Sequence, residues 1–75
     1  MQAPNINEFL DSLTTREKEI LVFIADGLTS NEIAAMLFRA ESTVKKHREH
    51  ILQKANVKGT SAIRKFIREI KPHLN

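Results

Sequence analysis

The residues best suited to chemistry lie in the segment AESTVKKHREHI, at positions 40–51. Lys45 and Lys46 are charged hydrogen-bond donors, and Glu49 supplies acceptors about one helical turn further on. Apolar Val44 and Ile51 are separated by about two turns of an α-helix. The spacing therefore predicts a helix with a buried apolar side and a polar side that could bind a negatively charged partner.

The polar side of this helix, expected over residues 41–55, carries groups that match the edges of DNA base pairs. At about 100° per residue, the outward side holds Ser42, Lys46, Glu49 and Gln53, with Lys45 at its edge. Lysine can donate to the O6 and N7 atoms of guanine, glutamate can accept from the cytosine amino group, and hydroxyls suit phosphate oxygens. The candidate base contacts are Lys45, Lys46 and Glu49. The candidate backbone contacts on this helix are Ser42, Thr43 and Arg48.

Catalytic, metal and cofactor chemistry finds no support in the sequence. The absence of cysteine excludes disulfides, thiolate metal ligands and thiol nucleophiles. No set of carboxylates or cysteines completes a metal site around His47 and His50, and we expect His47 to be a packed, hydrogen-bonded side chain at the border of the core. Glu17 and Glu19 face different directions on a helix. We therefore expect no enzyme activity, no metal and no cofactor.

Charge is distributed unevenly along the 75 residues, whose net charge is +3. Residues 1–37 hold two basic and six acidic side chains, a net charge of −4. Residues 38–63 hold six basic and two acidic side chains, and residues 64–75 hold four basic and one acidic. A polyanion would be attracted to one end of the molecule. Nucleic acid is therefore the leading class of partner, ahead of an acidic protein or a membrane surface.

Length and periodicity predict one small all-α domain. The sequence T-x-x-E occurs at residues 14–17 and 29–32 and fits the capping boxes of helices over 15–26 and 31–38. Gly27 suits the end of the first helix. Residues 38–40 must form a tight turn to the helix at 41–55, which begins without a capping oxygen at Ala40. We expect Ser42 or Thr43 to compensate in part.

A last helix is expected to begin at a capping Thr60 or Ser61 and to end before Pro72. Its apolar stripe consists of Ile63, Phe66, Ile67 and Ile70. The pattern thus predicts four helices in a bundle-like arrangement, of which the second and third have the lengths and turn of a helix-turn-helix. In that motif the second helix enters the DNA major groove.

The two chain ends carry weaker signals. Residues 1–13 are expected to be an N-terminal extension or linker, and residues 14–71 the domain itself. Residues 6–13 form either a short amphipathic turn docked on the domain or a frayed linker. No apolar run approaches the roughly 20 residues that cross a bilayer, and the N-terminus lacks the features of a signal peptide, so a cytoplasmic location is expected.

From Leu13 to about Phe66, the sequence resembles the LuxR-type helix-turn-helix domain of NarL-, FixJ- and GerE-like regulators. The resemblance rests on four blocks in the family's order: LTTREKEIL, GLTSNEIA, TVKKH and KANV. It implies a four-helix DNA-binding domain that serves a sequence-specific transcription regulator, or the C-terminal effector domain of a two-component response regulator. The implied partners are double-stranded DNA, a second copy of the chain and RNA polymerase.

The resemblance also implies roles for individual residues. Ser30 and Asn31, at the start of the second helix, match positions that contact the DNA backbone. The last helix commonly makes a symmetric dimer contact, for which the candidates are Ile63, Phe66, Ile67 and Ile70. Four positions depart from the common pattern: Ala40, Glu49, Ala55 and Thr60. The first two bear on groove affinity and base preference, and the last two on the seating of the final helix.

Two alternatives remain open on the sequence. The promoter-reading domain of sigma factors has a similar L-T-x-R-E opening, although TVKKH and the last helix argue against it. A helical module that binds an acidic protein through its basic side is the alternative from another functional class.

Overall fold

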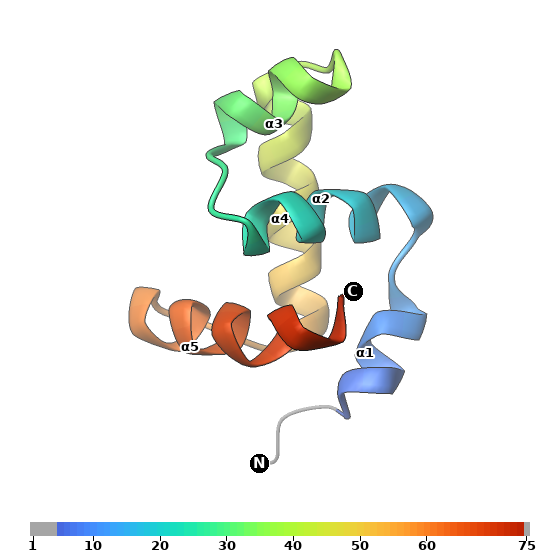
Figure 1. The fold of residues 1–75 in the computed structure, drawn as a ribbon, viewed down its shortest axis with the longest axis vertical. Coiled ribbons are helices and arrows are strands. Elements are labelled where there is room, and N and C mark those ends of the chain that lie inside the picture. Colours follow the sequence, from blue (N-terminus) through green and yellow to red (C-terminus); the bar gives the residue numbers. More distant parts are fainter. Residues whose placement is uncertain (1–4, 75) are drawn as a thin grey trace.

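Five α-helices and one short 3-10 helix make up most of residues 5–74, the part of the chain that the computed structural model describes (Figure 1). The helices are α1 (Ile6–Ser12), α2 (Thr15–Ala25), α3 (Ser30–Leu37), α4 (Glu41–Ala55) and α5 (Thr60–Ile70), followed by the 3-10 helix η1 (Lys71–His73). The all-α class is confirmed, and the predicted span of α4 matches the observed one. The four helices predicted for the domain are α2 to α5, and residues 6–12, for which a docked turn or a frayed linker was expected, form a helix of their own.

This additional helix, α1, is docked on the domain rather than frayed. The side chain of Asn5 accepts hydrogen bonds from the backbone amides of Asn7 and Glu8, which caps the start of the helix. Phe9 is only 3% exposed, and its ring meets that of Phe66 edge to face with 5.3 Å between centroids. Burial of Phe9 therefore anchors α1 to α5 and to the common core.

Both predicted capping boxes are present. The hydroxyl of Thr14 accepts from the amide of Glu17 at 3.1 Å, and the Glu17 carboxylate accepts from the amide of Thr14 at 2.9 Å. Thr29 and Glu32 make the same reciprocal pair at the start of α3. Hydrogen bonding to Thr29, mainly through its backbone amide and secondarily through its side chain, holds the pKa of Glu32 below its ordinary value. These boxes fix where α2 and α3 begin.

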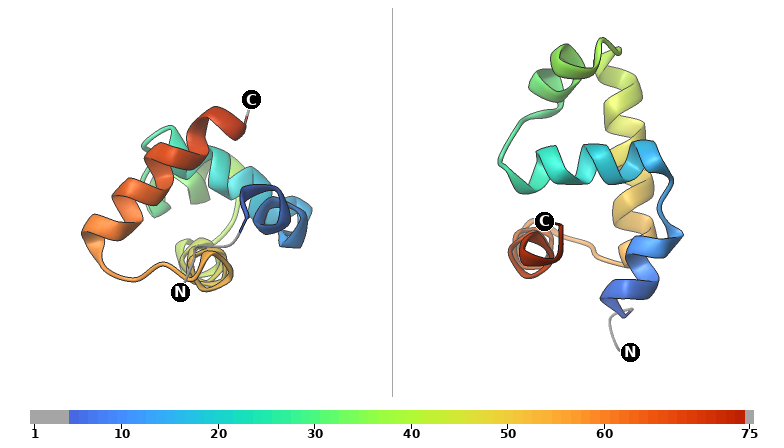
Figure 2. Two further views of the ribbon diagram at one scale, coloured as in Figure 1. Left: turned by 90° about the horizontal axis from the view of Figure 1, so that it is seen from below. Right: turned by 45° about the vertical axis from the view of Figure 1, so that its right-hand side comes forward.

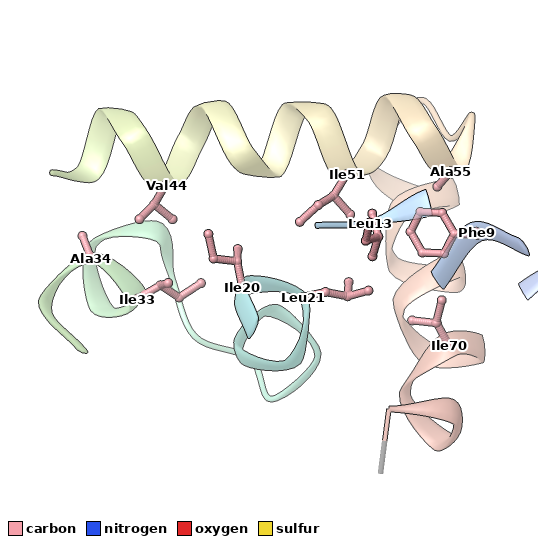
Figure 3. Close-up of a cluster of buried hydrophobic side chains, with 10 residues drawn as sticks. All are labelled: Phe9, Leu13, Ile20, Leu21, Ile33, Ala34, Val44, Ile51, Ala55 and Ile70. Carbon is pink, nitrogen blue, oxygen red and sulfur yellow. The ribbon is translucent and has the colours of Figure 1, made fainter. Parts of the chain in front are cut away.

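Helix α4 is the element on which α1, α2 and α3 pack, whereas α5 packs chiefly against α2. Helix α4 lies along the long axis of the molecule, with α3 and α2 crossing its N-terminal and middle parts and α1 and α5 lying towards its C-terminal end (Figures 1 and 2). The core is a row of apolar side chains beneath α4, in which Ile20 and Ile33 lie below Val44 and Ile51 (Figure 3). Burial of this row holds α4 in one orientation about its own axis.

The starts of α4 and α5 both lack a side-chain cap. Ala40 makes no capping hydrogen bond, as predicted, and neither Ser42 nor Thr43 replaces it. The prediction that Thr60 or Ser61 caps α5 is wrong. Gly59 occupies the N-cap with a φ of 88°, a conformation that residues with a Cβ rarely adopt. The turn into α5 is therefore made by backbone geometry instead of a hydroxyl.

The turn between α3 and α4 depends on an unusual residue. Phe38 ends α3 in the left-handed conformation, with a φ of 55°. The amide of Arg39 then donates to the carbonyl of Ala34 at 3.0 Å, which closes the helix end. Phe38 is 91% exposed, so packing of its ring contributes little stability to offset the strain of the left-handed backbone.

We expect Phe38→Gly to raise the free energy of unfolding by about 0.5 to 1 kcal/mol. Glycine adopts positive φ without steric cost, and this gain exceeds the extra freedom it gives the unfolded chain. Chemical denaturation followed by circular dichroism measures the change. Ala35→Gly, at an exposed position inside α3, is the control and should lose about 1 kcal/mol. Equal destabilisation by both glycines would contradict this account of the turn.

None of the helices in residues 5–74 is long and apolar enough to cross a membrane.

Candidate nucleic-acid interface

The interface begins with the two sides of α4. The buried side consists of Val44, Ile51 and Ala55, each of which is at most 1% exposed, as the helical spacing predicted. Lys45, Lys46, Glu49 and Gln53 are all exposed. Because the apolar residues are locked against α2 and α3, the polar residues are held outwards as a set. The structure therefore brings the three predicted base-contacting residues to one exposed side of one helix.

The two lysines on this side differ in their surroundings. The Lys45 ammonium lies 3.2 Å from a carboxylate oxygen of Glu41, one turn earlier, while its side chain remains 63% exposed. Exposed pairs of this kind are worth about 0 to 1 kcal/mol, so Glu41 can be exchanged for another anion at little cost. Lys46 makes no ion pair within residues 5–74. Both ammonium groups are therefore available to an incoming ligand.

The predicted backbone-contacting residues lie at the starts of two helices and along one flank. Ser30 and Asn31 begin α3, whereas Ser42 and Thr43 are exposed in the first turn of α4. Helix starts present free amides and a partial positive charge, both of which attract phosphate. Arg48 is half-buried, which agrees with its position about 40° from Val44 around the helix. Its guanidinium must reach round the edge of α4 to meet a phosphate.

The C-terminal part of α4 is tied to the rest of the domain by Lys54, a role that sequence reasoning missed. Its ammonium donates to the Glu17 carboxylate at 2.8 Å and to the backbone carbonyl of Ser12 at 2.9 Å. One side chain thus joins α4 to the end of α1 and the start of α2. The partners lie 37 and 42 residues away in the sequence, and no local pattern signals a contact of that range.

The environment of Glu17 has two opposing effects on its charge. Burial alone would raise the pKa of this carboxyl group, since its side chain is only 5% exposed. The hydrogen bond and positive charge of Lys54, together with the amide of Thr14, outweigh burial and lower the pKa below its ordinary value. Glu17 therefore holds a negative charge inside the protein, paired with Lys54.

His47 is packed as predicted, but the prediction that it is hydrogen-bonded is wrong for one of its nitrogens. The ring is half-buried, and its Nδ1 atom is buried without a hydrogen-bond partner among the described residues. No group of three or more histidine, cysteine or acidic side chains in the described part of the chain could hold a metal ion. His47 also lines a hollow together with Ser42, Thr43, Lys46 and His50. Sequence reasoning missed this grouping.

The stripe on α5 is divided by the fold. Ile70 lies in the core, and Phe66 packs on Phe9. Ile63 and Ile67 remain half-exposed and lie outside the core cluster. Of the four predicted dimer contacts, Ile63 and Ile67 are therefore the two that do not pack against the core.

Comparison with known proteins agrees with this geometry. Residues 11–66 match the family described as bacterial regulatory proteins, luxR family. The nitrate/nitrite response regulator protein homolog of Haemophilus influenzae is 54% identical over 48 residues, which are 64% of this chain and 23% of that protein. The oxygen regulatory protein NreC of Staphylococcus carnosus is 45% identical over 56 residues, 75% of this chain and 26% of NreC. No solved structure matches the chain.

A shorter relative extends the comparison. The spore germination protein GerE of Bacillus subtilis is 43% identical over 49 residues, 65% of this chain and 66% of GerE. The chain thus spans about a quarter of the Haemophilus influenzae and Staphylococcus carnosus relatives and two thirds of GerE. The family match covers the helix-turn-helix and favours the LuxR type over the promoter-reading domain of sigma factors. The chain belongs to the luxR family of bacterial regulatory proteins, and its α3–α4 unit is that family's DNA-binding helix-turn-helix.

Proposed function

We propose that this chain binds specific DNA sequences for a transcription regulator and that α4 enters the major groove as its recognition helix. The observation that carries the proposal is the sidedness of α4. Its apolar residues are fully buried, and its outward side offers two cationic donors and one carboxylate. A major groove about 12 Å wide admits one such helix and presents donors and acceptors to it.

The outward residues have distinct proposed roles. Lys45 and Lys46 donate to guanine O6 and N7, and Glu49 accepts from a cytosine amino group. Ser30, Asn31, Ser42, Thr43 and Arg48 contact the sugar-phosphate backbone and fix the position of α4 in the groove. The net positive charge of residues 38–75 then draws this end of the molecule towards DNA.

The wider organisation is also proposed. Residues 14–71 form the DNA-binding domain, and residues 1–13 are an extension whose α1 docks on it. Two copies bind a two-part site with Ile63 and Ile67 of α5 facing each other, while RNA polymerase is a further partner in the cytoplasm. The name of the Haemophilus influenzae relative favours the effector domain of a response regulator. This function requires neither catalysis nor a cofactor.

The test compares Lys46→Ala with Arg48→Ala on two duplexes, the best sequence selected from a random pool and a scrambled one. Lys46→Ala should lower discrimination between the duplexes by roughly 1 to 3 kcal/mol, because it removes a base contact. Arg48→Ala should weaken both duplexes alike and lower the slope of log affinity against log salt concentration by about 1. Fluorescence anisotropy at several salt concentrations measures all three quantities.

Lys58→Ala, at an exposed position outside α4, is the control for loss of one positive charge. Equal losses from Lys46→Ala and Arg48→Ala on both duplexes would contradict the assigned roles. A flat response of wild-type binding to salt would contradict DNA binding itself.

A further inference from the structure

One flank of α4 carries a hollow whose lining suits an anion. It has a volume of about 190 Å³ and is lined by Ser42, Thr43, Lys46, His47 and His50. These side chains offer hydroxyl, ammonium and imidazole groups, and no carboxylate lines the hollow. The grouping spans more than two turns of α4 and is therefore made by side chains rather than by the helix start alone.

The hollow lies at the border of the base-reading side: Ser42 and Lys46 of its lining belong to that side, and the other three lining residues do not. At about 100° per residue, Thr43, His47 and His50 lie roughly 90° further around α4 than the centre of Lys46, Glu49 and Gln53. A helix in the major groove has base edges in front of it and a phosphate wall on each side. When α4 reads bases, the hollow consequently faces one of these walls.

His47 provides the second observation. Its Nδ1 is the buried side-chain nitrogen or oxygen atom that lacks a partner within residues 5–74. A buried N–H without an acceptor is rarer in proteins than an unsatisfied acceptor, so the proton of the neutral ring belongs on Nε2. With Nδ1 buried as an acceptor, Nε2–H is the donor that the ring, which lines the hollow, can offer to a ligand.

We propose that this hollow binds one phosphate of the DNA backbone, with Nε2–H of His47, the ring of His50 and the hydroxyl of Thr43 as donors, while Lys46 at its edge keeps its contact with the bases. The inference rests on the proposed function and extends it to two histidines without an assigned role. A single open hollow holds free phosphate weakly, whereas a duplex already bound by α4 presents its phosphate at high effective concentration. The ligand is therefore the phosphate of bound DNA and not a free anion.

The experiment measures binding of His47→Ala, His50→Ala and His47→Gln to the pool-selected duplex and the scrambled duplex. Each alanine variant should bind both duplexes roughly tenfold more weakly with discrimination unchanged, because it loses a hydrogen bond to a charged oxygen. The amide N–H of glutamine can replace Nε2–H, so His47→Gln should recover much of the loss. His73→Ala, an exposed histidine on η1, is the matched control and should bind as wild type does.

A spectroscopic readout is independent of any change in stability. Long-range proton–nitrogen spectra should show the proton of His47 on Nε2, and the duplex should shift the ring signals of His47 and His50 but leave those of His73 in place. Inorganic phosphate at millimolar concentration should leave all three unmoved. Shifts with inorganic phosphate but not with the duplex would assign the hollow to a free anion and overturn the proposal.

The remaining outcomes separate this inference from the proposed function. Wild-type protein that binds neither duplex overturns both. Tight binding by wild type together with unchanged binding by His47→Ala and His50→Ala overturns only the phosphate site. A loss confined to the selected duplex would show that the histidines read bases, which also overturns it. If His47→Ala unfolds, the binding of His50→Ala and the ring signals of wild type decide the matter.

Discussion

Ile20→Ala is expected to lower the free energy of unfolding by about 2 to 5 kcal/mol, which would leave a domain of this size only marginally folded. Ile20 is 0% exposed and lies in the middle of the row of core side chains below α4 (Figure 3). Removal of its outer atoms leaves a cavity between α2, α3 and α4 that the surrounding helices can close only in part. Chemical denaturation followed by circular dichroism measures the loss.

The matched control for Ile20→Ala is the same substitution at Ile67. That side chain is half-exposed on α5 and lies outside the core cluster, so Ile67→Ala should cost less than about 1 kcal/mol in the monomer. DNA affinity should fall with the folded fraction of Ile20→Ala and recover under conditions that refold it. Similar costs at the two positions would contradict the claim that the core beneath α4 stabilises the domain.

Lys54→Met is expected to destabilise the protein by about 1 to 3 kcal/mol near pH 7. Removal of one partner of a buried ion pair costs about 3 to 5 kcal/mol, but the Lys54 side chain is 35% exposed, so water can replace part of what is lost. The variant leaves the Glu17 carboxylate buried with the amide of Thr14 as its remaining partner. Urea denaturation at several pH values measures the difference from wild type.

Acid should remove this difference. The pKa of Glu17 is lowered in the folded protein, so its contribution to stability is present above the ordinary value of 4.5 and is lost as pH falls through the lowered folded value. Wild type and Lys54→Met should therefore converge in stability as pH falls below 4.5. Lys58→Met is the matched control at an exposed position and should stay within about 0.5 kcal/mol of wild type. A difference for Lys54→Met that is unchanged in acid would disprove the pairing.

The Glu17–Lys54 pair matters for more than stability. It holds the C-terminal part of α4 against the junction of α1 and α2, while Val44 and Ile51 hold the N-terminal part and the middle. The ion pair and the two buried apolar residues together set the orientation of Lys45, Lys46 and Glu49. We therefore regard Lys54 as a positioning residue for the interface and not as one that touches DNA.

The sequence predicted the features of the fold that local signals specify. The two capping boxes fixed the starts of α2 and α3, and the spacing of Val44, Ile51 and Ala55 predicted which side of α4 is buried. The apolar spacing of residues 6–13 suited a docked amphipathic turn but left a frayed linker open. The contact between Phe9 and Phe66 settles that choice, and it depends on α5 lying beside α1.

Features that depend on distant parts of the chain could not be predicted in this way. Lys54 contacts Glu17 and Ser12 only because the fold brings three helix ends together, and a lysine near the end of α4 gives no local sign of it. The existence of the hollow beside His47 depends on how deeply the imidazole ring is buried against the rest of the domain, which the sequence does not specify. Gly59 replaced the expected hydroxyl cap of α5 because the chain turns there with positive φ, to which neither Thr60 nor Ser61 is suited.

The central claim is that the outward side of α4 occupies the major groove. It is tested most directly by titrating labelled protein with the pool-selected duplex and following every backbone amide signal by magnetic resonance. We predict the largest shifts over residues 42–50 and at the start of α3, with little change in α1. Saturated binding that leaves the α4 signals in place and shifts those of α5 would contradict the account.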